Sequence, residues 1–133
     1  MWPDDEVRAA LASLGREFNA ECGGRPVRAA NLHLTLAFLG DVSTARIPSL
    51  AKAMEEIEAA PFLLELDSCG YWRHNRIVWA GATQSPPALR QLVASLADRL
   101  SSFGFRREAR EHVPHITLVR DARRAPRSGM LHP

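Results

Sequence analysis

Residues 31–40, NLHLTLAFLG, and residues 113–120, VPHITLVR, each place a histidine and a threonine inside an apolar run. Both contain the motif His-x-Thr-Leu, which begins at His33 and at His115. Side chains two residues apart on a β-strand point to the same face, while their neighbours point to the other face. Each stretch is therefore predicted to be a strand with a polar histidine-threonine pair on one face and an apolar layer on the other.

The two motifs lie within a longer internal repeat. A shift of 82 residues aligns His33 with His115, and over positions 7–36 the same shift gives 9 identical residues in 30. Shared amphipathic composition explains part of this similarity, but the excess favours two copies of one helix-loop-strand unit. The repeat predicts two lobes related by a pseudo-two-fold axis, with both motif strands facing one cleft.

Apolar periodicity and turn residues predict an α+β fold. The expected fold has two lobes built from duplicated helix-strand units, with antiparallel sheets that form a central cleft. Residues 1–121 are expected to form this single domain, and residues 122–133 an irregular tail. The expected helices span about 4–19, 44–57 and 87–100, and the expected strands span 32–39, 62–69, 76–82 and 113–119, with the polar residues 70–75 joining the second and third strands as a hairpin connection.

Bulk composition excludes several classes of protein. The net charge of +2 is too small to predict polyanion binding by itself, although 16 of the 17 basic residues are arginine, which suits phosphate contacts. A GC-rich genome would give the same arginine bias. Cys22 and Cys69 have no C-x-x-C spacing, so neither a redox motif nor a zinc knuckle is indicated. No apolar run reaches the ~20 residues of a membrane span, and we expect a cytoplasmic protein.

Two facing histidines predict acid–base chemistry at phosphorus. Imidazole titrates near neutral pH, so one ring can accept a proton while the other donates one, and the threonine hydroxyls can hold a phosphate between them. A single His-x-Thr is more often only a half-buried pair on a sheet. A metal site is the other alternative, but the motifs contain no carboxylate, and His112 and His115 would fall on opposite faces of a strand. We therefore expect no metal and no cofactor.

The paired motifs resemble the two-histidine (2H) phosphoesterase superfamily, and most closely its RNA 2′,3′-cyclic phosphodiesterases, also described as RNA-ligase-like. The resemblance covers roughly residues 2–121, through WPDDEVRAALA, NLHLTLAFLGDV, RIVWAGA and PHITLVR. It implies metal-independent opening of an RNA-terminal 2′,3′-cyclic phosphate to a 2′-phosphomonoester. The implied partners are RNA 3′ ends or small 2′,3′-cyclic nucleotides, with no membrane, no protein partner and a monomeric chain.

The resemblance also implies residue roles. His33 would be the proton donor and His115 the proton acceptor, with Thr35 and Thr117 binding the phosphate. Arg120 matches an arginine that often follows the second motif. Strict alternation puts it on the face opposite His115, so only a weak phosphate contact is expected of it.

Other residues at the rim are less specific. Tyr71 and Trp72 are candidate nucleotide contacts, because bases stack on aromatic faces, although aromatic residues of a loop can also simply cover a sheet edge. Trp79 is expected in the core. The arginines at positions 106, 107 and 110 suit either an RNA backbone or a solvated loop.

Both ends of the chain differ from the pattern of that family. Its members usually begin with an apolar strand before the WPDD segment and continue through further strands after the second motif. Terminal strands are therefore expected to be missing here. The alternative function that follows is a catalytically impaired, truncated remnant that acts at most as a nucleotide-binding or RNA-end-binding module.

Overall fold

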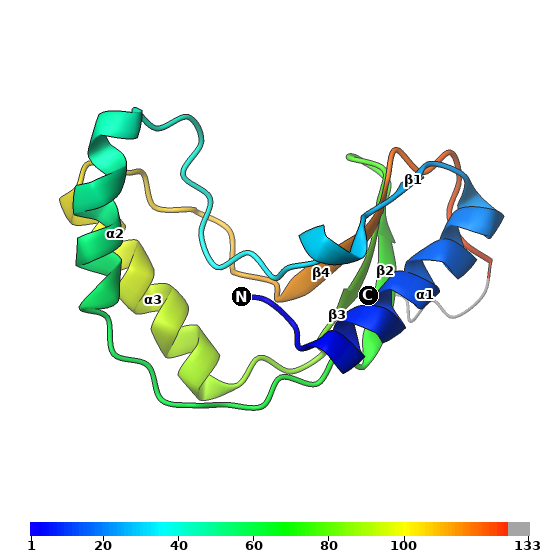
Figure 1. The fold of residues 1–133 in the computed structure, drawn as a ribbon, viewed down its shortest axis with the longest axis horizontal. Helices are drawn as coiled ribbons and strands as arrows, with labels where there is room; N and C mark the ends of the chain where they lie inside the picture. The colour runs from blue at the N-terminus through cyan, green and yellow to red at the C-terminus, as the bar shows by residue number, and fades with distance from the viewer. Residues whose placement is uncertain (128–133) are drawn as a thin grey trace. The chain divides into compact units, whose positions relative to one another are not determined.

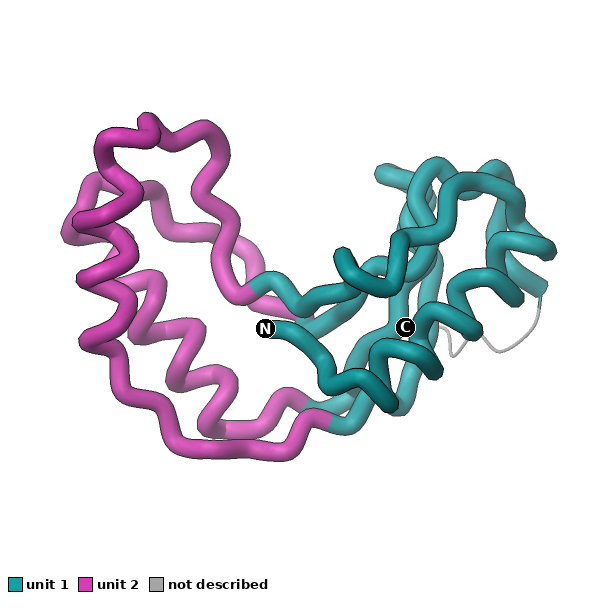
Figure 2. The backbone as a smooth tube through the Cα atoms, in the orientation of Figure 1, with its two compact units in different colours: residues 1–35, 65–84, 114–133 teal, residues 36–64, 85–113 magenta. Residues whose placement is uncertain are grey.

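The computed structural model describes residues 1–127 of the 133-residue chain. Two compact units are formed from interleaved segments (Figure 2). Unit 1 contains residues 1–35, residues 65–84 and the chain from residue 114 onward, and unit 2 contains residues 36–64 and 85–113. Both His-x-Thr motifs lie in unit 1. Of the predicted tail, residues 122–127 contain neither helix nor strand, and the remainder lies outside the described residues.

Helices and antiparallel strands confirm the α+β class (Figure 1). Unit 1 holds α1 (Asp5–Cys22), β1 (Arg25–Pro26), the 3₁₀ turn η1 (Ala29–Asn31), β2 (Ser68–Trp72), β3 (Ile77–Gly81) and β4 (His115–Arg120). Unit 2 holds the 3₁₀ turn η2 (Thr44–Arg46), α2 (Ile47–Glu55) and α3 (Pro87–Ser102).

Helix α1 begins with a cap that its sequence supplies. The backbone N–H of Val7 donates to Oδ1 of Asp4 at 2.9 Å, and two acidic residues occupy the first turn, where the helix dipole favours negative charge. The backbone N–H of Gly23 donates to the carbonyl of Asn19 at 2.9 Å, so the helix extends to Cys22 and not only to the predicted residue 19.

The sheet of unit 1 has the order β1-β4-β3-β2 and is antiparallel throughout. One face, called here the α1 face, packs on α1 and carries the buried side chains of Val78, Ala80, Ile116 and Leu118. At Gly15 of α1, an added Cβ would lie 3.3 Å from the carbonyl oxygen of Leu118, so the helix and β4 are in close contact. The opposite face, called the site face, carries His115 and Thr117.

Two of the predicted strands were placed wrongly. In the predicted strand 32–39, only Leu34 forms a β-bridge. The predicted strand 62–69 is displaced, since β2 begins at Ser68 and includes Trp72. Exposure alternates along residues 61–67, yet within the described part of the chain they belong to no strand. Alternation reports extended backbone, whereas a strand also needs a hydrogen-bonded neighbour.

Unit 2 is built from two helices and their connections. Leu50 and Ala53 of α2 and Leu89 and Leu100 of α3 are buried. Between the two helical segments, Nη1 of Arg99 lies 3.2 Å from a carboxylate oxygen of Glu56. These contacts define a separate small core.

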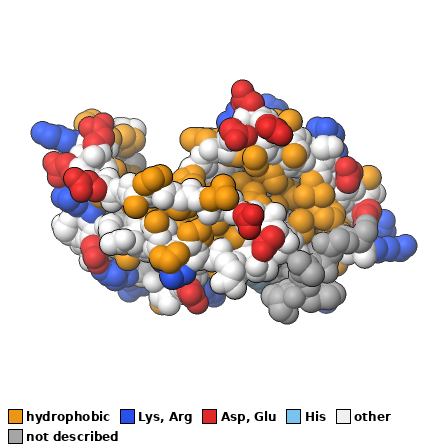
Figure 3. Space-filling view, turned by 90° about the horizontal axis from the view of Figure 1, so that it is seen from below, with side chains coloured by type: hydrophobic (Ala, Val, Ile, Leu, Met, Phe, Trp, Pro, Cys, Tyr) orange, Lys and Arg blue, Asp and Glu red, His pale blue; other side chains and the backbone are white. Residues whose placement is uncertain are grey.

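The surface charge is mixed. On the face drawn in Figure 3, acidic and basic side chains of the described residues are interspersed, in keeping with the net charge of +2. None of the described helices is long and apolar enough to cross a lipid bilayer.

Candidate active site

A single β-bridge joins the two motif segments. Leu34 pairs with Ile116 in antiparallel orientation, and the side chains are 3% and 4% exposed. On its other side, Leu34 exchanges two backbone hydrogen bonds with Met1, at 2.9 and 2.8 Å. Leu34 and Ile116 are also equivalent positions under the shift of 82 residues. The central residues of the two motifs are therefore bonded neighbours.

The bridge determines how the polar side chains are arranged. In an antiparallel pair, the flanking residues meet in reverse order, so His33 lies opposite Thr117 and Thr35 lies opposite His115. Because Leu34 and Ile116 are buried, all four flanking side chains occupy the site face. The two histidines are diagonal neighbours, a relation that separates such residues by about 7–8 Å in antiparallel sheets. That spacing leaves room for a phosphate between the rings.

His33 is held by its own local backbone. Its Nδ1 lies 2.7 Å from the carbonyl oxygen of Asn31, the last residue of η1. A carbonyl only accepts, so Nδ1 carries the hydrogen and Nε2 is the nitrogen left for proton exchange. The indole of Trp2 flanks the ring, with centroids 5.4 Å apart. His33 is nevertheless exposed to solvent.

His115 is held differently, by the body of the sheet. It is the first residue of β4, pairs with Gly81 of β3 and is half-buried. The ring of Trp72 meets the imidazole edge-on, with centroids 4.5 Å apart and an interplanar angle of 74°. Thr117 pairs with Trp79 one step along the strand pair.

Arg120 is on the site face, contrary to the expectation from strict alternation. Val78 and Trp79 are consecutive in β3, yet they pair with Val119 and Thr117, so Leu118 is an additional residue in β4. Such a β-bulge shifts the alternation by one residue. Val119 therefore shares the α1 face with Val78, and Arg120 returns to the face of Thr117, where it is exposed.

The chain just beyond Arg120 is fixed by ion pairs. Asp121 accepts a hydrogen bond from Nε of Arg25 at 2.9 Å and one from Nη2 of Arg76 at 3.4 Å. Arg25 also pairs with Arg120 in the β1–β4 ladder. The end of β4 is thus tied to both β1 and the β2–β3 turn.

Of the two candidate nucleotide contacts, only one lies on the site face. Tyr71 pairs with Val78 and belongs to the α1 face, whereas Trp72 pairs with Ile77 and belongs to the site face. Trp79 is 7% exposed, as expected for a core residue, but its indole lies on the site face beside Thr117.

Two glycines of the site face were not among the predicted site residues. A Cβ at Gly70 would overlap Cζ2 of Trp79, and a Cβ at Gly81 would lie 2.8 Å from Cζ3 of the same ring. Gly81 lies inside a predicted strand, where glycine often marks the close approach of another group, whereas Gly70 was assigned to the predicted hairpin connection.

The remaining candidates lie in unit 2. They are the arginines at positions 106, 107 and 110 and His112. Arg107 forms an ion pair with Asp98 within unit 2. Among residues 1–127, no three His, Cys, Asp or Glu side chains are grouped as ligands of a metal ion.

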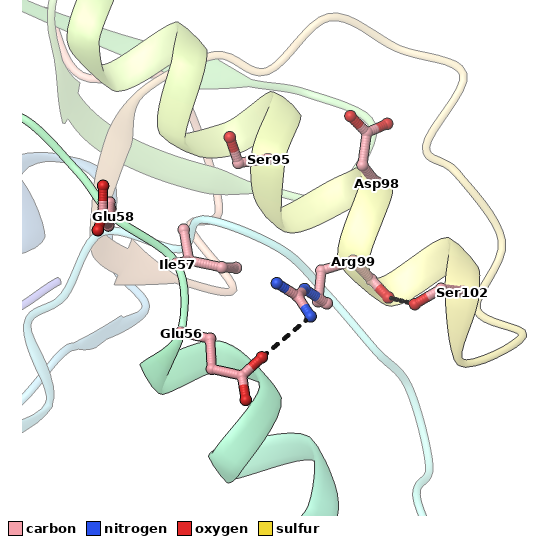
Figure 4. A pocket seen from close by; sticks show the side chains of 7 residues that line it. All are labelled: Glu56, Ile57, Glu58, Ser95, Asp98, Arg99 and Ser102. Carbon is pink, nitrogen blue, oxygen red and sulfur yellow. Dashed lines mark hydrogen bonds and ion pairs between the residues drawn. The ribbon is translucent and has the colours of Figure 1, made fainter.

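A hollow of about 600 Å³ in unit 2 is lined by Asp98, the partner of Arg107, and by six further residues (Figure 4). Arg99 lies in it, 3.2 Å from a carboxylate oxygen of Glu56. Two further carboxylates line the hollow and would repel a phosphate. Its lining residues are Glu56, Ile57, Glu58, Ser95, Asp98, Arg99 and Ser102.

Outside the motif pair, burial or hydrogen bonding shifts the pKa of three described side chains of unit 1, those of Cys22, Asp67 and Cys69. Burial raises the pKa of the thiols of Cys22 and Cys69, which disfavours the thiolate a nucleophile would need. Hydrogen bonds from the Thr83 hydroxyl and backbone N–H lower the pKa of Asp67. Asp67 precedes β2 and Thr83 follows β3, so this contact closes the end of the hairpin beside His115.

Comparison with known proteins identifies the family of this chain. The model of the LigT like Phosphoesterase family matches residues 1–79 and 81–128. An RNA 2′,3′-cyclic phosphodiesterase of Escherichia coli (strain K12) is 45% identical over 102 residues, which cover 77% of this chain and 58% of that protein. The chain therefore spans little more than half the length of that relative.

Solved structures give the same result. A crystal structure described as a phosphoesterase superposes with a TM-score of 0.84 at 37% identity, covering 97% of this chain and 77% of that one. Escherichia coli LigT complexed with 3′-AMP superposes with a TM-score of 0.82 at 36% identity, covering 97% and 76%. From its sequence and its fold, the chain belongs to the LigT-like phosphoesterase family.

Proposed function

We propose that this chain opens RNA-terminal 2′,3′-cyclic phosphates to 2′-phosphomonoesters without a metal ion. The observation that carries the proposal is the Leu34–Ile116 bridge, because it brings both histidine-threonine pairs onto one face. The name of the Escherichia coli relative supports the substrate class, and the 3′-AMP complex of Escherichia coli LigT supports binding of a nucleotide phosphate.

The proposed reaction needs one base and one acid. His115, in the neutral form, takes a proton from water as the water oxygen attacks phosphorus. The bond between phosphorus and the 3′ oxygen breaks, and the His33 imidazolium gives its Nε2 proton to that oxygen. The products are a 2′-phosphomonoester and a free 3′ hydroxyl. The Nδ1 contact of His33 with Asn31 supports Nε2 as the donor atom.

The other polar side chains of the site face would bind the phosphate. Thr35 and Thr117 lie opposite the two histidines, where their hydroxyls can donate to non-bridging oxygens. Arg120 adds a positive charge on the same face because of the bulge in β4. Charge-assisted hydrogen bonds of this kind are about twice as strong as neutral ones.

Turnover of adenosine 2′,3′-cyclic phosphate, followed by ³¹P NMR with and without EDTA, tests the proposal. We expect hydrolysis at the same rate in both conditions, with adenosine 2′-phosphate as product. Formation of the 3′ isomer would contradict His33 as acid toward the 3′ oxygen. A rate abolished by EDTA and restored by a divalent cation would contradict the metal-free mechanism.

Arg16→Ala is the matched control, since Arg16 is exposed on α1, which packs on the sheet face opposite the site. Its rate should equal that of the unmodified chain. Binding of 3′-AMP without any turnover would instead favour the alternative function, a nucleotide-binding module.

A further inference from the structure

On the site face, Trp72 contacts the rings of both Trp79 and His115. Its ring centroid lies 5.2 Å from that of Trp79 and 4.5 Å from that of His115. The Trp79 contact is tilted by 39°, and the His115 contact is close to perpendicular at 74°. Trp72 comes from β2 and His115 from β4, so Trp72 reaches across β3 to the imidazole.

The glycines of the site face provide the space for this arrangement. Gly70 of β2 pairs with Trp79, and its missing side chain leaves room for the indole to lie against the backbone. At Gly81, an added Cβ would lie 2.8 Å from Cζ3 of Trp79 and 2.9 Å from the carbonyl oxygen of Pro114. Any side chain at either position would displace Trp79 from the sheet, and Trp72 rests on Trp79.

The contact with Trp72 acts on a histidine whose orientation matters for the proposed reaction. His115 is the first residue of β4 and only half-buried, so its ring is not enclosed by the core. A general base must present one nitrogen toward the attacking water, and a misplacement of about 1 Å can cost 10²-fold in rate. A perpendicular contact with an aromatic ring is a preferred geometry and restricts rotation of the imidazole.

We propose that Trp72 is a positioning residue, which rests on Trp79 over Gly70 and Gly81 and holds the His115 imidazole in the orientation for proton transfer. The inference builds on the proposed hydrolysis. It differs from the expectation that Trp72 stacks on a nucleobase, because a base contact would act on substrate binding, whereas positioning acts on the chemical step.

Kinetics of Trp72→Ala on two substrates separate these roles. One substrate is adenosine 2′,3′-cyclic phosphate, and the other is a ribose 2′,3′-cyclic phosphate that lacks a base. We expect kcat to fall by about 10- to 100-fold on both substrates with little change in KM, as for loss of orientation. Trp72→Phe should restore most of kcat. A loss confined to the nucleotide and expressed in KM would overturn positioning in favour of base stacking.

Gly70→Ala provides a second variant that leaves Trp72 intact. It should lower kcat as Trp72→Ala does, because the new methyl group displaces Trp79 and with it Trp72. The matched control is Tyr71→Leu, which removes a ring from the same strand on the α1 face and should preserve kcat. Equal losses in Tyr71→Leu and Trp72→Ala would show a general effect on β2 and overturn the proposal.

An NMR measurement keeps the inference separate from the proposed function. In Trp72→Ala, the Hε1 and Hδ2 resonances of His115 should move because the ring current of Trp72 is lost, while those of His33 stay in place. Unchanged His115 resonances would contradict the contact itself. If the unmodified chain turns over neither substrate, the proposed hydrolysis fails, and the resonances still report whether Trp72 holds the ring.

Discussion

The two His-x-Thr segments have the same residue pattern but very different structural support. His33 is exposed, lies in a segment with one β-bridge, and is oriented by a hydrogen bond to Asn31 two residues away. His115 is half-buried, lies in a strand with neighbours on both sides, and contacts an aromatic ring from β2. The neighbouring backbone and the ring of Trp2 hold the first histidine, and the body of the sheet holds the second.

This difference suits the roles proposed for the two residues. The donor must deliver its proton from one defined nitrogen, and a backbone carbonyl on the other nitrogen defines it. The base must stay aligned with a mobile water molecule, which requires a rigid setting. Because the two histidines are supported differently, substitutions near one motif should affect activity differently from substitutions near the other.

The largest effect is expected from removing either histidine. His33→Ala and His115→Ala should each lower kcat on a 2′,3′-cyclic nucleotide by about 10²- to 10⁴-fold, because each removes one proton-transfer partner. The pH profile of kcat/KM should lose its acid-group limb in His33→Ala and its base-group limb in His115→Ala. Loss of the same limb in both variants would contradict the division of roles.

Arg120 should have the next largest effect. Arg120→Ala removes a charged hydrogen-bond donor worth about 1.5–3 kcal/mol, so kcat/KM should fall roughly 10- to 150-fold. Arg16→Ala, at an exposed position of α1, is the matched control and should have the activity of the unmodified chain. If the two variants behave alike, the bulge in β4 does not bring Arg120 to the substrate.

Amide hydrogen exchange should separate the two segments directly. We expect the Leu34 amide, bonded to the carbonyl of Met1, to exchange at least about tenfold faster than the β4 amides that bond within the sheet. Local opening of a singly bridged segment breaks fewer contacts than opening of a central strand. Equal protection of both segments, measured by NMR, would mean that the first motif is supported as firmly as the second.

The smallest effect is expected at the hairpin end beside His115. The hydrogen bonds from Thr83 lower the pKa of Asp67 in the folded chain. This carboxylate therefore stabilises the fold at pH values above its unfolded pKa of about 3.9. The contribution is lost as the pH falls through the lower, folded pKa. Thr83→Val should raise the Asp67 pKa in a ¹³C NMR titration. The His33 resonances should not change, and a change there would mean that the two segments are not independent.

Much of the site was predictable because it depends on local periodicity. The spacing of two in His-x-Thr put each pair on one face, and the shift of 82 residues linked the two pairs. The strand boundaries at 32–39 and 62–69 were wrong because alternation detects extended chain but not its hydrogen-bonded partner. Tyr71 and Trp72 looked equivalent in sequence, and only their pairing with β3 assigned them to opposite faces.

The sequence by itself determined the α+β class, the histidine-threonine pairs and the family resemblance, because these follow from the order and spacing of side chains. Only the tertiary structure decided that Leu34 and Ile116 are neighbours, that a bulge returns Arg120 to the site face, and that Trp79 lies over two glycines. The first two depend on register between segments far apart in the chain, and the third depends on the register of the β2–β3 hairpin. A shift of one residue reverses every side chain of a strand, and no local pattern records it.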